Sequence, residues 1–153
     1  MEHPKKPIVY LAIAGVIIIG ASLAYWYQHK TIDPKKFSSE TIEYSRDTKG
    51  LPQGFLSNIP VEVENITTSE TLLYPERKAT VMNVTYQSSK QQEELSSIYA
   101  SYLKNEGYTI TTSSKTAEKT VYAATKDKNE LNVTISPQSG RMGILLSYVV
   151  RGE

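Results

Sequence analysis

Three carboxylates lie near one another in the middle of the chain and are the first candidates for chemistry. Glu62 and Glu64 alternate in a segment that reads as a strand, which places both on one face, and Glu70 follows closely. Paired carboxylates can transfer protons or bind calcium. A calcium loop needs several oxygen ligands around a glycine turn, and this segment lacks them. A solvent-exposed edge strand is therefore the favoured interpretation.

Other catalytic side chains are scarce or badly placed. The only histidines, His3 and His29, flank a hydrophobic segment, and the chain has no cysteine. Histidine triads in the following domain, thiol catalysis and Cys/His metal sites are thereby excluded. Serine and lysine are abundant, but no motif places a serine on a strained turn beside a buried lysine. The sequence predicts no catalytic residue, no metal site and no cofactor.

The charge distribution argues against nucleic acid as a partner. The formal net charge is +1, yet the chain up to Lys36 carries five lysines against two acidic residues. The remainder is therefore slightly acidic. Binding to a phosphate backbone requires lysine and arginine clustered on the domain itself.

Tyrosine is unusually frequent, with eleven residues in the chain. Tyr99 and Tyr102 fall on the apolar stripe of a predicted helix, which makes them core candidates. Four further tyrosines occupy predicted strand positions: Tyr74, Tyr86, Tyr122 and Tyr148. Packing between neighbouring strands is the favoured role for these four. The alternative is an exposed aromatic platform for a protein or glycan partner.

The strongest pattern in the chain is residues 8–27, which contain no charge over 20 positions. A helix of that length spans about 30 Å, the thickness of the hydrocarbon core of a bilayer. Lysines precede the segment and an aromatic cluster closes it, as at a membrane interface. The predicted anchor residues are Ile8, Tyr10, Leu11, Ile13, Val16, Ile17, Ile18, Ile19, Leu23, Tyr25, Trp26 and Tyr27.

Two alternatives to this anchor remain open. Residues 22–24 fit a signal-peptidase site, although the apolar run exceeds the usual signal-peptide length of about 7–15 residues. Lysines occur on both sides of the segment, so the positive-inside rule does not fix the orientation. The short basic tail, residues 1–7, favours a signal anchor in the cell membrane with the N-terminus inside and the C-terminal domain outside. A cytoplasmic domain is the alternative.

A polar linker is predicted over residues 28–54 and an α+β domain over residues 55–153. The clearest element of the domain is a helix over residues 90–106, opened by a capping box of Ser89 and Gln92 and ended by Gly107. Its apolar stripe follows helical spacing. The stripe consists of Leu95, Ile98, Tyr99, Tyr102 and Leu103.

Strands are predicted on both sides of this helix from alternation of apolar residues. They cover residues 79–87 before it and residues 108–112, 120–125, 131–136 and 143–150 after it. An earlier pair of segments, residues 61–66 and residues 71–74, is expected to add an edge strand. The predicted fold is α+β, an antiparallel sheet of about five to six strands in the order ββαββββ, with one helix packed on a face.

Several runs carry a resemblance to a known kind of domain. They are GFLSNIPVEVENITTSETLLYP, QQEELSSIYASYLKNEGYTI and VYAATKDKNELNVTISP. Together they resemble small bacterial α+β domains that are membrane-anchored or lipoprotein-like and have no established activity. The likeness covers residues 54–148 and departs at Tyr108, where such domains usually have tryptophan. It implies the fold and export, and it transfers no site residues.

These patterns lead to three functional hypotheses. The first is a single-pass, membrane-anchored accessory or interaction domain that is not an enzyme. Its expected partners are the lipid bilayer and another membrane or envelope protein. The second is a secreted or tethered domain that binds a small ligand or a glycan. The third is a hydrolase that uses serine, lysine or carboxylates, and no visible nucleophile–base pair supports it.

Overall fold

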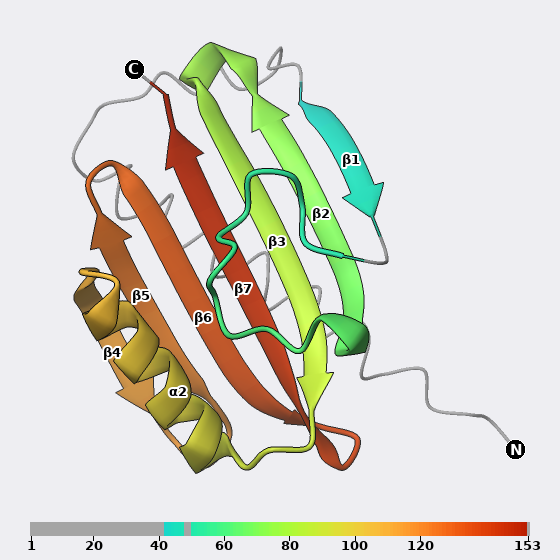
Figure 1. Ribbon diagram of the computed structural model, residues 1–153, viewed down its shortest axis with the longest axis vertical. Helices are drawn as coiled ribbons and strands as arrows, with labels where there is room; N and C mark the ends of the chain where they lie inside the picture. The colour runs from blue at the N-terminus through green and yellow to red at the C-terminus, as the bar shows by residue number, and fades with distance from the viewer. Residues whose placement is uncertain (1–41, 48–49, 153) are drawn as a thin grey trace, which may run out of the picture. The chain divides into compact units, whose positions relative to one another are not determined.

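The computed structural model describes residues 42–47 and 50–152 of the chain. Within them, seven strands and one α-helix form an α+β arrangement (Figure 1). In chain order the elements are β1 (Glu43–Asp47), η2 (Val63–Asn65), β2 (Ile66–Tyr74), η3 (Pro75–Arg77), β3 (Ala79–Ser88), α2 (Gln92–Asn105), β4 (Thr109–Lys115), β5 (Thr120–Lys126), β6 (Asn129–Gln138) and β7 (Arg141–Arg151).

The strands form one open sheet in the order β1-β2-β3-β7-β6-β5-β4. Every neighbouring pair is antiparallel. The α+β class, the antiparallel sheet and the single helix are therefore confirmed. The strand number is not, because the described part of the chain has seven strands in the order βββαββββ.

The error in strand number arises before the helix. Residues 71–74 belong to one long strand, β2, that begins at Ile66, whereas residues 63–65 form the short η2 turn instead of a strand. The additional strand β1 lies within the segment predicted to be linker. Its residues from Glu43 to Arg46 are exposed. Because β1 carries no alternating apolar pattern, periodicity could not reveal it.

Alternation within the central strands builds one apolar face of the sheet. In β3, β6 and β7 every second side chain is buried, and no more than 7% of any of these side chains is exposed. The residues are Met82, Val84, Tyr86, Leu131, Val133, Ile135, Ile144, Leu146 and Tyr148. We call this side of the sheet the core face and the opposite side the outer face.

The helix α2 packs on the core face over β4, β5 and β6 (Figure 1). Four of the five stripe residues are buried, and Ile98 is half-buried. At the C-terminal end, Gly107 takes a left-handed φ of 77°, and the Tyr108 N–H donates to the Leu103 carbonyl at 2.9 Å. This geometry satisfies a carbonyl of the last turn and stops the helix.

The helix begins differently from the prediction. Its N-cap is Gln91, which makes no side-chain capping bond, so the predicted capping box is wrong. The Gln92 side chain donates instead to the carbonyl of Thr116 at 2.8 Å and to the hydroxyl of Thr120 at 3.0 Å. It therefore ties the helix to the β4–β5 turn and cannot fold back onto its own N-terminus.

The rest of the core face is covered by residues 50–62, which we call the strap. In Figure 1 the strap crosses in front of β2, β3 and β7, on the same side of the sheet as α2. Two residues of the strap, Phe55 and Ile59, are buried in the core. The Phe55 ring meets the Tyr148 ring edge-on, with 5.9 Å between the centroids. Backbone hydrogen bonds of the strap are local, for example from the Phe55 N–H to the Pro52 carbonyl and from the Val61 N–H to the Ile59 carbonyl. Side chains hold it on the sheet.

Residues 42–47 and 50–152 contain no helix with the length and apolarity needed to cross a bilayer. The predicted membrane helix, residues 8–27, lies outside the described residues, as do all of its anchor residues. The anchor stays a prediction.

If the strap is part of the core, truncating its main apolar side chain will be costly. Phe55→Ala is expected to lower the free energy of unfolding by about 3 kcal/mol, because it removes a buried ring and leaves a cavity. Urea denaturation of the purified chain measures this. Val63→Ala, at a position that is 47% exposed, is the control and is expected to cost less than about 0.5 kcal/mol. Equal, small effects at both positions would show that the strap packs loosely.

Candidate functional site

Tyrosine hydroxyls fill the seam between the strap and the helix. The hydroxyls of Tyr86 and Tyr99 lie 2.7 Å apart, and Tyr99 donates to the Pro60 carbonyl at 3.0 Å. Burial raises the pKa of Tyr86 to about 12 and raises that of Tyr99 further above its usual range. Both side chains are therefore neutral near pH 7 and act as hydrogen-bonding fillers. They are not a proton-transfer pair.

The other tyrosines of the interior are bonded in the same way. Tyr102 donates to the Asn58 side chain at 3.2 Å, and the Tyr122 hydroxyl lies 2.7 Å from that of Ser96. Tyr86, Tyr122 and Tyr148, three of the four strand tyrosines, are buried on the core face. An exposed platform made of these three is excluded. Only Tyr74 of the four lies on the outer face, because its partner Ala79 is three positions from Met82, a core-face residue of β3.

The carboxylates singled out in the sequence are separated in space. Glu62 ends the strap on the covered side of the sheet, while Glu70 in β2 pairs with Asn83 on the outer face. Among residues 42–47 and 50–152, no three acidic or histidine side chains group as metal ligands. The structure therefore brings together neither an acid–base pair nor a calcium site from these residues.

Glu62 is instead a structural clamp. Its carboxylate accepts hydrogen bonds from Lys90 at 2.8 Å, from Ser88 at 2.7 Å and from Asn65 at 2.8 Å. Burial alone would raise the pKa of Glu62, but these three donors outweigh it and hold the pKa below its usual range. The clamp joins the end of the strap to the β3–α2 connection.

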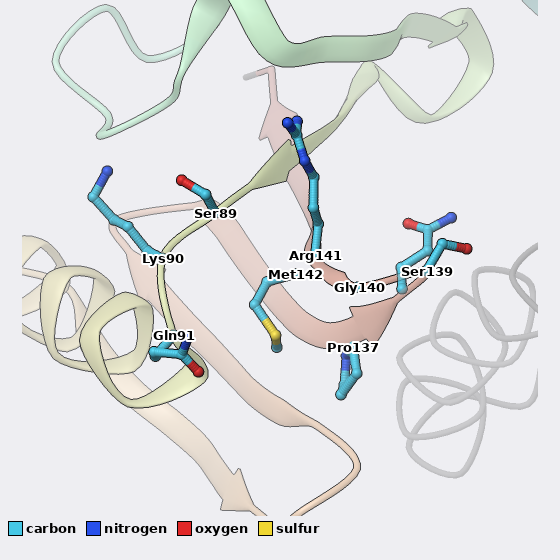
Figure 2. Close-up of a pocket in the computed structure, with 9 residues that line it drawn as sticks. Ser89, Lys90, Gln91, Pro137, Ser139, Gly140, Arg141 and Met142 are labelled. Atoms are coloured by element: carbon cyan, nitrogen blue, oxygen red, sulfur yellow. The ribbon is translucent and has the colours of Figure 1, made fainter.

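A small hollow of about 270 Å³ lies next to this clamp, between the β3–α2 connection and the β6–β7 turn (Figure 2). Lys90 and Arg141 stand at its margin, and Met142 lies between them in the view. The hydrogen bond to Glu62 raises the pKa of Lys90, so its ammonium stays protonated and is a poor base. None of the described residues that line the hollow carries a carboxylate or an imidazole. It offers hydroxyls, amides and cations without an acid–base pair.

The described elements leave the outer face of the sheet uncovered. Pairing aligns one residue from each strand in a row across the whole sheet. From β4 to β1 the row is Thr112, Ala123, Asn132, Ser147, Asn83, Glu70 and Arg46. These side chains are partly or fully exposed, as expected for an antiparallel sheet with one solvated face.

Next to this row, one corner of the outer face is apolar. We call it the corner patch, and it consists of Tyr44, Leu72, Tyr74, Val81 and Val149. Directly paired positions join Tyr44 to Leu72, Leu72 to Val81, and Val81 to Val149. Tyr44 is 56% exposed. Apolar and aromatic side chains are therefore contiguous over β1, β2, β3 and β7. No helix or loop of residues 42–47 and 50–152 packs over them, because α2 and the strap lie on the core face.

Arginines border the corner patch. The Arg77 guanidinium lies 5.9 Å from the centre of the Tyr74 ring. Arg46 approaches Glu70 at 3.7 Å, and Arg151 pairs with Glu130 at 3.1 Å. Aromatic and apolar residues at the centre with arginine at the rim are the composition enriched in protein–protein interfaces.

Sequence reasoning missed this patch. Tyr44 falls within the predicted linker, and the alternation that predicts strands marks the buried positions beside Leu72 and Val81. A usable signal was present. Leu72 and Leu73 are adjacent, as are Val81 and Met82, and apolar side chains at consecutive strand positions face both sides of a sheet.

Comparison with known proteins places the domain in a family. A family model described as START domain-like matches residues 63–141, just over half of the chain. The matched residues run from η2 to the start of β7. The match shows no membrane-anchored or lipoprotein-like family. No curated protein and no solved structure matches the chain.

The clamp predicts a pH-dependent contribution to stability. Glu62→Gln is expected to lower the free energy of unfolding by about 1–2 kcal/mol at pH 7, because a charge-assisted hydrogen bond is lost. A carboxyl whose pKa is lower in the folded state stabilises the fold above its unfolded pKa, and the effect disappears as pH falls through the folded value. The difference between variant and parent should therefore shrink below about pH 4.5.

Denaturation curves at pH 7 and pH 3 measure this difference. Glu64→Gln, two residues away and exposed, is the matched control and is expected to change stability by less than about 0.5 kcal/mol. A difference for Glu62→Gln that is the same at both pH values would contradict the clamp.

Proposed function

The chain belongs to the START domain-like family, and we propose that it is a non-enzymatic binding domain tethered to the cell membrane. In this proposal residues 8–27 anchor the chain and the domain works outside the cytoplasm. The corner patch binds another membrane or envelope protein. The observation that carries the proposal is that apolar and aromatic side chains are contiguous in the corner patch, whereas elsewhere on the outer face apolar residues such as Leu145 and Val121 pair with threonine.

The interior supports binding over catalysis. Burial raises the pKa of Tyr86 and of Tyr99, so both stay neutral near pH 7. The hydroxyls of Tyr99 and Tyr102 donate to the strap. Glu62 accepts hydrogen bonds from three donors on both carboxylate oxygens. A catalytic acid or base needs a titratable group within reach of a substrate, and neither place supplies one.

The chemistry of the corner patch indicates what a partner must offer. The patch presents two phenol rings and three aliphatic side chains, so a partner must bring apolar surface. The hydroxyl of Tyr44 donates to Glu70 at 3.1 Å, which fixes the ring against β2. An anchored aromatic side chain loses little conformational freedom on binding and is a common hot spot.

The tether explains why a modest patch is sufficient. Residues 28–41 separate the predicted membrane segment from Ile42, and 14 extended residues reach at most about 50 Å. A partner in the same membrane is then held within this radius. Confinement of this kind raises the effective concentration and allows a weak interface to be occupied.

Site-specific cross-linking tests the proposal, since the chain has no cysteine to interfere. Leu72→Cys, labelled with a photoactivatable cross-linker in native membranes, is expected to give one discrete adduct with another protein. Ser101→Cys, exposed on α2, is the control position and should give none. Adding Val81→Asp should reduce the Leu72 adduct by on the order of tenfold.

Thr125→Asp is the matched charge control. Thr125 lies on the same face as Val81 and is aligned with it through Val149 and Glu130, but it is in β5, away from the corner patch. This substitution should leave the adduct unchanged. Equal adducts from positions 72 and 101, or insensitivity to Val81→Asp in a chain that still folds, would disprove docking at the corner patch.

A second candidate function is suggested by the hollow. Its volume of about 270 Å³ is below the usual range for drug-sized ligands, about 300–1,000 Å³, so only a small ligand fits. Its hydroxyl and amide lining from Ser89, Gln91 and Ser139 suits a neutral polar molecule such as a sugar unit.

Ligand-observed NMR with glucose, maltose and N-acetylglucosamine tests this candidate. Saturation transfer to a sugar is expected with the parent chain and should be lost in Arg141→Ala, because Arg141 borders the hollow. Lys104→Ala, on α2 and away from the hollow, is the control. No transfer with any of the three sugars, or identical transfer in both variants, would rule it out.

A further inference from the structure

The two edges of the sheet differ in a way that the proposed function does not explain. The β1 edge is short and charged, since three of its five residues are Glu43, Arg46 and Asp47. Charges on an edge strand discourage pairing with another chain. The β4 edge has seven residues, and six of them, TITTSS, are uncharged. One edge is therefore protected by its composition and the other is not.

The β4 strand is also fully accessible. All seven of its residues are exposed, and Ile110 is 40% exposed. It pairs with β5 on one side and ends the strand order on the other. Within residues 42–47 and 50–152, no strand uses the backbone N–H and C=O groups of its outer side. An edge of this kind is a ready template for another strand.

We propose that β4 pairs with β4 of a second copy of this chain, in antiparallel orientation about a two-fold axis, and so joins two sheets into one. This inference concerns a different surface from the corner patch and does not depend on the proposed docking there. A second copy of β4 fits this edge because the middle of the strand carries no charge, so two copies can lie opposite each other without repulsion.

The position of the single charge is compatible with self-pairing. Lys115 is the last residue of β4, and its ammonium pairs with the Glu93 carboxylate of α2. In an antiparallel pair centred on Ser113, Lys115 lies opposite Thr111 of the other copy. The two lysines are then about 13 Å apart along the strands, which avoids direct repulsion of like charges.

A bulge limits which residues take part. The register of β4 against β5 shifts between Ile110 and Thr112, and the Thr111 hydroxyl donates to the Ala123 carbonyl at 3.1 Å. From Thr112 to Lys115 the ladder is regular. A pairing centred on Ser113 takes its three central residues, 112–114, from this regular stretch, and directly opposed Cα atoms in an antiparallel pair lie about 4.5–5.5 Å apart.

That separation suits a disulfide, which needs Cα atoms about 4.4–6.8 Å apart. The test is a cysteine series in the full-length, otherwise cysteine-free chain, oxidised in native membranes: Thr112→Cys, Ser113→Cys and Ser114→Cys. We expect a covalent dimer that is strongest at position 113. Ser45→Cys on the charged β1 edge and Ser101→Cys on α2 are controls and should stay monomeric.

Each outcome decides the matter. No covalent dimer above the controls at any of the three β4 positions would overturn the proposal. An adduct with a protein of different mass would also overturn it, because the edge would then belong to another partner. A dimer from β4 with no adduct at the corner patch would retain this inference while the proposed docking fails.

A charge introduced at the edge provides an independent test. Ser113→Lys in the purified full-length chain should shift the mass measured in detergent micelles from dimer to monomer, because two like charges would meet at the axis. Ser45→Lys on the β1 edge is the matched control and should leave the mass unchanged. A thermal unfolding curve establishes that each variant folds, and a dimer that survives Ser113→Lys would contradict the pairing.

Discussion

Seven strands about 4.8 Å apart make a sheet roughly 30 Å wide, whereas a helix with its side chains is about 10 Å across. Since α2 is the one α-helix of residues 42–47 and 50–152, it leaves most of the core face uncovered. The strap supplies the missing cover and buries Phe55 and Ile59 against the central strands. Much of the remaining architecture follows from this mismatch in width.

A cover without regular secondary structure needs hydrogen-bond donors from elsewhere. The tyrosines provide them, because their rings fill the space between strap and helix while their hydroxyls reach the Pro60 carbonyl and the Asn58 side chain. Glu62 fixes the end of the strap by accepting three hydrogen bonds. Three of the buried tyrosines, Tyr86, Tyr99 and Tyr102, therefore serve to hold a loop over a wide sheet. Because these tyrosine rings fill the space under the strap, the surfaces open to a partner are the outer face and the sheet edges.

The parts that could be predicted from sequence are those governed by local periodicity. Alternation located β3 and the strands after the helix, and helical spacing with Gly107 located α2. The misses have a different physical origin. The strap is defined by contacts with residues far away in the chain, β1 has no apolar alternation, and Gln92 bonds to a distant turn in place of capping its helix. The corner patch required the register of four strands, which no local pattern contains.

Register also determines how the two exposed surfaces relate. The corner patch spans β1, β2, β3 and β7, while β4 lies at the other end of the strand order. With strands about 4.8 Å apart, the β1 and β4 edges are separated by roughly 30 Å. The charges of β1 discourage strand addition beside the corner patch, so association there must proceed through side chains on the outer face. A strand added at β4 extends the sheet in its own plane and leaves that face open. Edge pairing and face docking are therefore geometrically compatible in one molecule.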